Sequence, residues 1–284
     1  MNVIMTADDF GKSGETNQAI QQAFQYGNLT ETSLMVSGEA VTDAVTFARE
    51  NPGLSIGLHL VLSDGQSVLP KEKIPHLVDK DGYFSTNASI AGIKYFFSRQ
   101  CHHELNLEIQ AQFEKFAETG LAMSHVDGHQ HLHIHPTIFK MILPLAEKYG
   151  ARGIRIPHDD LFASLRFCRR GLGLKLAWRI IFGLLSSWCS RQLNRSTLLK
   201  TERVYGVLQS GNMREDYVVY LLQHINRPAI ELYFHPALDG KQIKYGANRG
   251  DLNSLMSPHV KQALHEANIH LIGYSGLQEP KGET

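Results

Sequence analysis

The chain has 284 residues, of which 43% are hydrophobic and 20% are charged. This composition is ordinary for a globular protein and excludes a disordered or collagen-like chain. Lysine and arginine number 28, as do aspartate and glutamate, so no overall charge attracts the chain to nucleic acid. Three cysteines without a Cys-x-x-Cys pair, no signal-peptide pattern and no run of roughly 20 apolar residues together predict a cytoplasmic protein.

Short apolar runs alternate with helix-like segments along the chain. Strands are predicted at residues 2–6, 32–37, 54–60, 122–126, 152–156, 229–234 and 269–274. Helices are predicted at residues 14–27, 40–50, 104–119, 137–149, 213–225 and 258–267. This alternation is typical of βαβ units and a parallel sheet, and about eight strands favour a barrel over an open sheet. We therefore predict an α/β fold: a single (β/α) barrel-like domain of distorted TIM type over residues 1–284, with residues 61–97 as a long loop over one rim.

Chemically reactive side chains recur where the predicted strands end, which is where α/β barrels carry their active sites. They are Asp8 and Asp9, then His59, the group His125, Asp127 and His129, and finally Arg155 and His235. The strand pattern thus places residues that are distant in sequence around one rim.

The acidic pair Asp8–Asp9 directly follows the first predicted strand. Neighbouring residues of an extended chain point to opposite sides, so one carboxylate can bind a metal while the other faces the substrate or its water. The alternative is an ordinary helix start, where carboxylates are favoured. His59 lies inside an apolar strand, and the alternative to a functional role is that it is a hydrogen-bonded residue of the core. Its position beside the other groups favours a site.

Five histidines lie between residues 125 and 135, in the run HVDGHQHLHIH. A spacing of two puts His125, Asp127 and His129 on one face of an extended segment, which indicates a metal or proton-transfer site. His133 and His135 fall at the start of the next helix, and we expect them to be structural. An aspartate with two histidines suits Zn²⁺, whereas open, oxygen-rich positions would also accept Mg²⁺.

A cation held in this way lowers the pKa of bound water and polarises a carbonyl oxygen. A free carboxylate can then take a proton from water, and a histidine can protonate a leaving nitrogen. The sequence has no G-x-S-x-G elbow, no P-loop and no G-x-G-x-x-G motif, so a serine hydrolase, an NTPase and a Rossmann dehydrogenase are poorly supported. These groups therefore predict a hydrolase that acts on a carbonyl compound.

Four motifs, TADDFG, GLHLVL, HVDGHQHLH and YFHPA, occur in this order between residues 6 and 237 and resemble the YdjC-like carbohydrate deacetylases. That family has a (β/α)-barrel-like fold and removes acetyl groups from N-acetylated sugars with a divalent metal. The resemblance implies that Asp9, His59 and His129 are the metal ligands.

The same resemblance implies three catalytic roles. Asp8 becomes the general base, His235 the acid or a substrate contact, and Arg155 the residue that orients Asp8.

Longer stretches, among them SLMVSG, GLHLVLSDGQSVLP and IPHLVDKDGYF, look most like the hopanoid biosynthesis-associated (HpnK) branch of this family. The resemblance implies deacetylation of the N-acetylglucosaminyl group of a bacteriohopanetetrol glycolipid, with soluble chitooligosaccharides as the alternative substrates. Two other classes remain open, a non-catalytic sugar-lipid binding barrel and a metal phosphohydrolase. A binding barrel has no need of a base beside a metal, and a phosphohydrolase would show more charged groups at the strand ends.

Residues 161–201 do not fit a minimal barrel and contain no aspartate or glutamate, and we predict a basic, apolar helical insert there. Eight cations lie between residues 161 and 200: Arg166, Arg169, Arg170, Lys175, Arg179, Arg191, Arg195 and Lys200. A helix with a broad apolar face, tryptophans and flanking cations is typical of an interfacial membrane helix. We therefore expect peripheral contact with the inner membrane through residues 165–192. The alternatives are a helix packed in the outer layer of the barrel and a homodimer interface.

Overall fold

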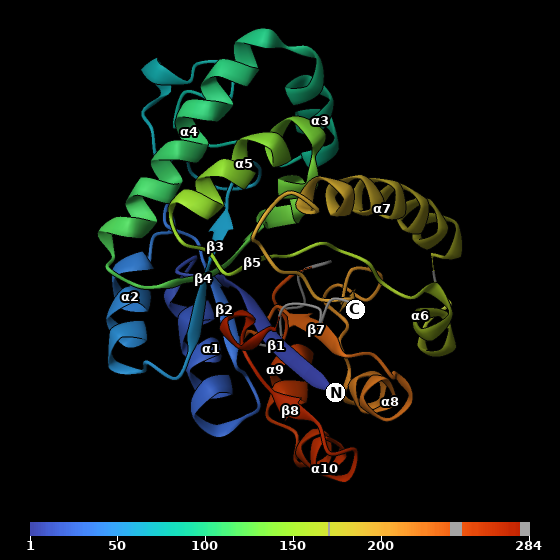
Figure 1. Cartoon of the computed structure of the whole chain (residues 1–284). Coiled ribbons are helices and arrows are strands. Elements are labelled where there is room, and N and C mark those ends of the chain that lie inside the picture. Colours follow the sequence, from blue (N-terminus) through green and yellow to red (C-terminus); the bar gives the residue numbers. More distant parts are fainter. Residues whose placement is uncertain (170, 239–245, 279–284) are drawn as a thin grey trace.

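The centre of the molecule is a curled parallel sheet. A computed structural model describes residues 1–169, 171–238 and 246–278 (Figure 1). Its strands are β1 (Asn2–Phe10), β2 (Glu31–Leu34), β3 (Ser55–Leu60), β4 (Met123–Gly128), β5 (Gly153–Ile154), β6 (Arg203–Tyr205), β7 (Ala229–Phe234) and β8 (His270–Leu271). Their order across the sheet is β5-β4-β3-β2-β1-β7-β6, and β8 pairs with the first residues of β1. The predicted α/β fold with a parallel sheet is confirmed.

The two edge strands of the sheet, β5 and β6, approach each other through the residues that precede β6. Gly153 of β5 forms an isolated parallel bridge with Leu199. The amide of Val204 in β6 donates to the carbonyl of His158 at 3.3 Å. These contacts accompany a half-barrel curl of the sheet that is consistent with a distorted (β/α) barrel. Because the strands are parallel, their carboxyl ends meet at one rim.

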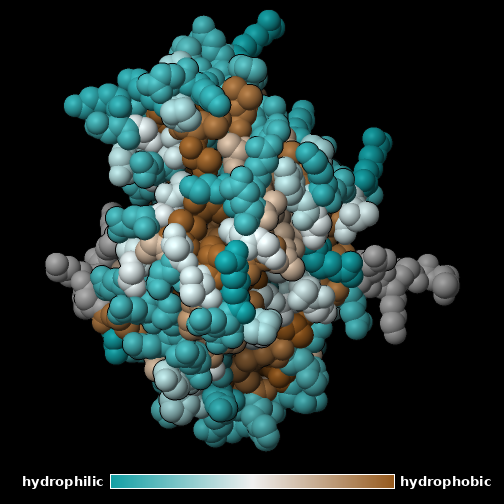
Figure 2. All heavy atoms as spheres, turned by 90° about the vertical axis from the view of Figure 1, so that its left-hand side faces the viewer, coloured by the Kyte–Doolittle hydropathy of each residue, from teal (hydrophilic) through white to brown (hydrophobic). Residues whose placement is uncertain are grey.

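Helices surround the sheet (Figure 1). They are α1 (Gly14–Tyr26), α2 (Val41–Glu50), α3 (Ala88–Phe97), α4 (Arg99–Glu118), α5 (Pro136–Lys148), α6 (Leu161–Phe167), α7 (Leu172–Leu193), α8 (Glu215–His224), α9 (Arg249–Leu255) and α10 (Pro258–Glu266). Sequence signals set several of their starts. Ser13 caps α1 by accepting a hydrogen bond from the amide of Thr16 at 3.2 Å, and Pro136 occupies the first turn of α5, where a missing N–H costs nothing. Figure 2, turned so that the left-hand side of Figure 1 faces the viewer, shows a mostly hydrophilic surface with smaller hydrophobic groups between.

The structure corrects the sequence-based prediction in four places. Residues 61–97 are not all loop, because α3 occupies their last ten residues and is capped by Asn87, which accepts from the amide of Ile90 at 3.1 Å. The short elements β6 and α9 were missed, since three to seven residues give no hydrophobic period to recognise. The strands predicted at 152–156 and 269–274 contain only Gly153–Ile154 and His270–Leu271. Finally, β1 continues to Phe10, so Asp8 and Asp9 lie within the strand and not after it.

Residues 161–201 contain α6 and α7, and Arg170 lies outside the described residues. One side of α7 is packed against the barrel, where Ser186, Cys189 and Leu193 are buried. Its other side leaves Ile180 and Leu184 exposed, with 54% and 70% of their surface accessible. By length and composition alone, Leu172–Leu193 is apolar enough to cross a membrane.

Candidate active site and metal centre

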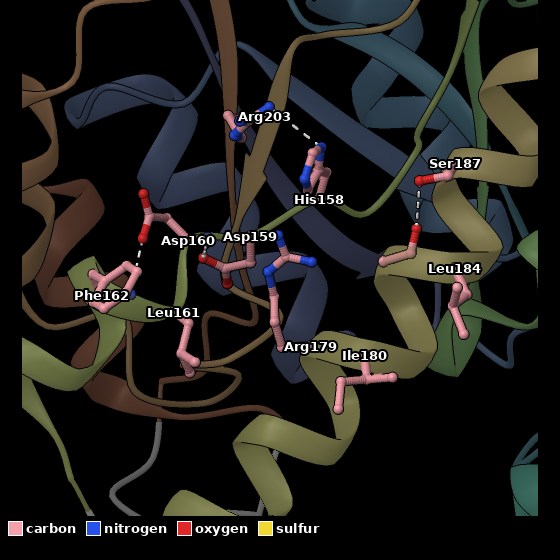
Figure 3. A pocket seen from close by; sticks show the side chains of 11 residues that line it. His158, Asp159, Asp160, Leu161, Phe162, Arg179, Ile180, Leu184, Ser187 and Arg203 are labelled. Carbon is pink, nitrogen blue, oxygen red and sulfur yellow. Dashed lines mark hydrogen bonds between the residues drawn. The ribbon is translucent and has the colours of Figure 1, made fainter.

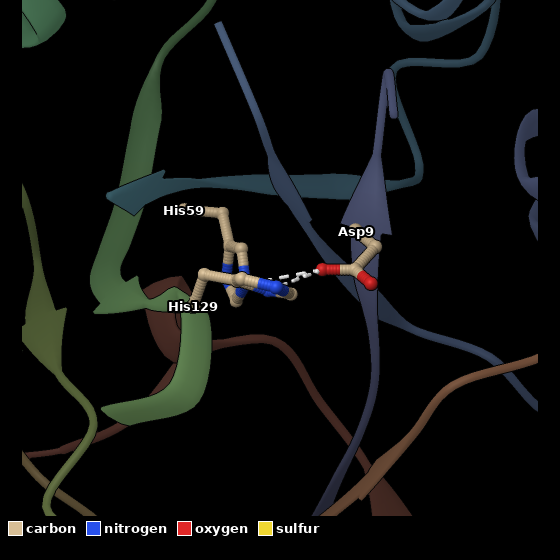
Figure 4. Close-up of side chains that lie close together, drawn as sticks. All are labelled: Asp9, His59 and His129. Carbon is tan, nitrogen blue, oxygen red and sulfur yellow. Dashed lines mark ion pairs between the residues drawn. The ribbon is translucent and has the colours of Figure 1, made fainter. Parts of the chain in front are cut away.

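Asp9, His59 and His129 meet at the carboxyl-end rim of the sheet (Figure 4). Asp9 belongs to β1, His59 to β3, and His129 is the first residue of the short 3-10 helix that follows β4. Each offers one ligand atom, and these atoms all lie within 4.8 Å of one another. The order of β4, β3, β2 and β1 in the sheet makes the ends of these strands neighbours, which explains the meeting of residues 120 positions apart.

The contacts within this group fit a bound cation. Asp9 Oδ1 lies 3.4 Å from His59 Nε2 and 2.9 Å from His129 Nδ1. Asp9 Oδ1 and His59 Nε2 are buried without a hydrogen-bond partner among the described residues. Unpartnered buried acceptors are costly, and two of them face each other here beside His129. One carboxylate with two imidazoles matches the three-ligand set of a catalytic Zn²⁺ site. Asp9, His59 and His129 are therefore the residues that could hold a divalent metal.

Charged neighbours shift the pKa values of Asp9 and His59 in opposite directions. Burial raises the pKa of Asp9, but His129 and Lys12 outweigh it and hold that pKa well below its usual value. Lys12 Nζ lies 2.9 Å from Asp9 Oδ2. Burial lowers the pKa of His59, yet the carboxylate of Asp127 outweighs this and raises it to about 10. His59 thus lies in the negative potential of Asp127, whereas Asp9 lies in the positive potential of His129 and Lys12.

A second layer of hydrogen bonds orients His59. Its Nδ1 lies 2.8 Å from Asp127 Oδ1 and 2.9 Å from Ser33 Oγ, so its Nε2 is left to face Asp9. Carboxylates that hold the far nitrogen of a histidine are typical of metal-binding imidazoles. Asp127, which the sequence placed on one face with His129, therefore contacts His59 from behind and lies outside the group of Asp9, His59 and His129. Asp127 does share a second possible ligand group with Asp8 and His59.

Asp8 is held by the fully buried Arg155, which directly follows β5. Arg155 Nη1 and Nη2 donate to the two carboxylate oxygens of Asp8 at 2.8 and 2.9 Å. The same Nη1 lies 2.7 Å from Asp127 Oδ2. Such a bidentate fork fixes the direction of a carboxylate as well as its charge. The structure therefore brings Asp8 and Arg155 together from opposite halves of the chain.

Asp8 and Asp9 both face one cavity, although strict strand alternation would separate them. The register of β1 against β2 shifts between Ala7 and Phe10, and Asp9 has a φ of 69°. A positive φ is uncommon for aspartate and re-aims the side chain. This local irregularity is what puts neighbouring carboxylates on the same side.

Glu231 is a part of the site that sequence reasoning missed. It lies in β7, is fully buried, and its Oε1 accepts from Arg155 Nη2 at 2.8 Å and from Thr6 Oγ1 at 2.7 Å. Its Oε2 accepts from the hydroxyl of Tyr274 at 2.6 Å. A glutamate inside the apolar strand AIELYF was the available signal, because a buried carboxylate needs such partners. Glu231 thus holds the Nε–Nη2 edge of Arg155, next to the Nη1–Nη2 edge that holds Asp8.

His235 follows β7 and lies at the edge of this group. Its Nε2 is 3.9 Å from Asp8 Oδ2, and its amide donates to Asp251 Oδ2 at 2.8 Å. Nearby, the hydroxyl of Tyr233 lies 3.0 Å from His131 Nε2, and both side chains line the cavity. His235, His131 and Tyr233 thus provide polar groups beside the two carboxylates. The roles of His131 and Tyr233 were not foreseen from the sequence.

The cavity itself has a volume of about 610 Å³. Asp8, Asp9, His59, His129 and His235 all line it, whereas Arg155 stands behind Asp8 and does not. Further parts of its wall come from the residues before and at the start of α3, which are mostly polar, and from Trp178, Ile181 and Phe182 of α7. The strand ends thus make the cavity charged, and α7 adds an apolar wall.

The other histidines of the 125–135 run take structural positions. His125 lies deep in the barrel, where its Nδ1 is 2.9 Å from Glu31 Oε1 and its ring stacks on Tyr274. His133 Nε2 lies 2.9 Å from the carbonyl oxygen of Arg155, and His135 is the residue that precedes α5. His125 is thus not brought to the group of Asp9, His59 and His129, although its spacing suggested a shared face. The expectation for His133 and His135 agrees with these contacts.

Comparison with known proteins places the chain in a family. Residues 2–266 match the family model described as YdjC-like protein. The chain is 29% identical over 283 residues to a carbohydrate deacetylase of Brevibacillus brevis, covering 98% of this chain and 100% of that protein. It is 28% identical over 284 residues to a carbohydrate deacetylase of Vibrio parahaemolyticus, covering 98% and 96%.

A solved structure from Enterococcus faecalis V583, whose description names cellobiose-phosphate cleavage, shares the fold. Its TM-score is 0.75 at 23% identity, covering 98% of this chain and 99% of that chain. At this level of identity the likeness concerns the fold alone. Because the family model spans nearly all of the sequence, the chain belongs to the YdjC-like protein family.

Proposed function

We propose that the protein is a metal-dependent hydrolase that removes an acetyl group from an N-acetylated amino sugar. The observation that carries this proposal is that Asp9, His59 and His129 meet in one cavity. Beside them in the same cavity lies Asp8, which accepts two hydrogen bonds from Arg155. The full-length relatives that are named carbohydrate deacetylases support the class of substrate. A barrel that only binds sugar would have no use for a carboxylate positioned beside a cation site.

Asp9, His59 and His129 would hold the cation, with Zn²⁺ or Mg²⁺ as the proposed identities. When bound, a divalent cation polarises the acetyl carbonyl and makes water more acidic. The cavity in front of the three side chains leaves room for both water and the sugar. Lys12, beside Asp9, limits the net negative charge that the three ligands present.

Asp8 is the proposed general base and takes a proton from the water that attacks the acetyl carbon. Arg155 holds both oxygens of Asp8 in one plane, so that their free lone pairs point in fixed directions. We assign His235 as the donor of a proton to the leaving amine, because its ring lies beside Asp8 and lines the same cavity. Acetate and a free amino sugar are the products.

We further propose that the sugar is the N-acetylglucosaminyl group of a hopanoid glycolipid. The apolar wall that Trp178, Ile181 and Phe182 add to the cavity supports a substrate with an apolar portion. Residues 165–192 would then contact the membrane that holds this lipid, and the protein would act at the cytoplasmic side of the inner membrane. Soluble chitooligosaccharides are the alternative substrates, and they would make little use of the apolar wall.

The test is acetate release from an N-acetylglucosaminyl lipid and from diacetylchitobiose, each with and without a chelator. We expect release that the chelator abolishes and that added metal restores, with the glycolipid preferred. Release from diacetylchitobiose alone would agree with the proposed deacetylase activity but would overturn the glycolipid as its substrate. No release from either substrate by metal-loaded, folded protein would overturn the proposed function.

A further inference from the structure

A second cavity, of about 620 Å³, lies against α7 (Figure 3). It is lined by α7, by the start of α6 with the residues before it, and by Arg203 of β6. Trp178 and Ile181 of α7 face the active-site cavity, whereas Ile180 and Leu184 face this second one. One helix thus lines both cavities. The proposed deacetylation uses only the first.

The polar wall of the second cavity is basic. Arg179 extends from α7 toward the segment that carries His158, and Arg203 Nη1 lies 3.3 Å from His158 Nδ1 (Figure 3). Within the described part of the chain, neither arginine forms an ion pair with a carboxylate. Two guanidinium groups that line one cavity without carboxylate partners suit an anion.

The two acidic residues of this cavity are directed to backbone amides. Asp159 accepts from the amides of Asp160 at 2.7 Å and Leu208 at 2.9 Å. Asp160 caps α6 by accepting from the amide of Phe162 at 2.8 Å. Both oxygens of Asp159 and one oxygen of Asp160 therefore hold the loop, and neither carboxylate forms an ion pair with Arg179 or Arg203 among the described residues.

The remaining wall is apolar and open to solvent. Phe162, Ile180 and Leu184 line the cavity with 85%, 54% and 70% of their surface exposed. Large exposed apolar groups next to unpaired cations suit a ligand that has a charged head and an apolar tail. A free inorganic anion would not account for this apolar wall.

The surroundings match a negatively charged bilayer. Residues 161–200 carry eight lysines and arginines and no aspartate or glutamate. Across the mouth of the active-site cavity, α3 exposes Ile90, Ile93 and Phe97, with 61%, 64% and 78% of their surface accessible. Residues at the start of α3 and residues of α7 both line that cavity, so the two apolar helices flank one opening. A bilayer that covers them would lie against the entrance.

The packing of α7 favours a helix that lies along the bilayer surface over one that crosses it. Ser186 donates to the carbonyl oxygen of Pro157, and Trp188 packs edge-on against Phe139 of α5. Cys189 is fully buried against the carbonyl of Ile134. Crossing a bilayer would require all of these contacts to break.

We propose that the second cavity binds the anionic head group of a membrane phospholipid and thereby docks the protein on an anionic lipid surface. The phosphate lies between Arg179 and Arg203, and the acyl portion lies along Phe162, Ile180 and Leu184. This deepens the proposed function, because docking would bring the active-site opening to a lipid-borne substrate. The site itself does not depend on the hydrolytic activity, so the two can fail separately.

The test is flotation of the purified full chain with vesicles of phosphatidylcholine alone and of phosphatidylcholine with phosphatidylglycerol. We expect binding to the anionic vesicles only, with release by high salt. The variant Arg179→Gln/Arg203→Gln should lose at least about thirtyfold in vesicle affinity. The control Arg191→Gln/Arg195→Gln removes the same charge from the same segment outside the cavity, and should lose clearly less than the cavity variant, because it removes only diffuse, salt-screened attraction.

Several outcomes would overturn the site. Equal losses of vesicle affinity in the two variants would mean that binding is only diffuse electrostatic attraction. Equal binding to neutral and anionic vesicles would mean that the cavity does not recognise an anionic head group. Inorganic phosphate that competes as well as dispersed phosphatidylglycerol would make the ligand a free anion. Resistance to salt and alkaline extraction would indicate a spanning helix, and a dimer that hides α7 would indicate a second copy.

Two further measurements keep the test independent of variant folding and of activity. Brominated phosphatidylglycerol should quench the tryptophan fluorescence of the unaltered chain, because Trp178 lines the active-site cavity on α7, whose opening docking would bring against the bilayer. Absence of quenching would contradict docking even if both variants failed to fold. Vesicle binding without acetate release would overturn the proposed function alone, and acetate release without vesicle binding would overturn this site alone.

Discussion

The replacement Arg155→Lys tests whether a rigid fork, and not merely a positive charge, organises the site. Arg155 is fully buried and makes hydrogen bonds to both oxygens of Asp8 at 2.8 and 2.9 Å, and to Glu231 at 2.8 and 3.0 Å. It also lies 2.7 Å from Asp127. A lysine keeps the charge, but its single nitrogen cannot reach all three carboxylates at once.

The magnitude follows from the bonds that are lost. Hydrogen bonds to charged groups contribute about 1.5–3 kcal/mol each, and lysine would forfeit at least two of those that Arg155 makes. We therefore expect the free energy of unfolding to fall by about 3–5 kcal/mol, which is also typical of breaking a buried ion pair. Because Asp8 is no longer held in one direction, kcat should fall by about 10²-fold. KM should change little, since Arg155 does not line the cavity.

Urea unfolding and steady-state acetate release measure the two effects. The matched control is Arg214→Lys, because Arg214 forms an exposed ion pair with Asp216 at 2.9 Å. Exposed pairs contribute about 0–1 kcal/mol, so this control should leave stability and kcat nearly unchanged. An Arg155→Lys protein as stable and as fast as the Arg214→Lys protein would refute the positioning role of the fork.

Three further predictions follow from the site and its surroundings. Asp8→Asn should retain bound metal but lose about 10²–10⁴-fold in kcat, as judged by acetate release together with metal content; normal turnover would remove Asp8 as the base. His59→Ala and His129→Ala should each lose metal on dialysis, measured by atomic spectroscopy, and full retention would speak against them as ligands. Burial, with Arg203 and Arg179 nearby, lowers the pKa of His158 to about 4, whereas a histidine in the unfolded chain titrates near 6.5. Between about pH 6.5 and pH 4, His158 is protonated in the unfolded chain but neutral in the folded protein, so folding stability declines as the pH falls through this range. His158→Gln should therefore show a shallower decline in melting temperature over the same range. Parallel declines in the two proteins would contradict this.

Local pattern alone predicted much of the architecture. Alternating apolar runs and helical segments indicated the parallel sheet, and β3 and β7 lie almost where they were expected. The run from residue 125 to 135 and the DD pair marked the strand ends that carry the chemistry. These features are readable because each depends on residues close together in the chain. The prediction missed short elements such as β6 and α9, because so few residues cannot show a hydrophobic period.

Long-range pairing decided which of the marked residues work together. Sequence spacing grouped His125 with His129, yet the barrel turns His125 toward Glu31 and leaves His129 beside Asp9. No sequence feature near Arg155 indicates that it contacts Asp8, which is 147 positions away. No feature near Glu231 indicates that it binds the same guanidinium group.

The backbone of β1 also mattered, because regular alternation would have sent Asp8 and Asp9 to opposite faces. The shifted register before Phe10 and the positive φ of Asp9 bring both carboxylates into one cavity. The sequence by itself thus determined which side chains are available and near which strand ends they lie. Their grouping was decided only by the tertiary structure, because strand order and the cost of burying an unpaired charge act between residues that are far apart in the chain.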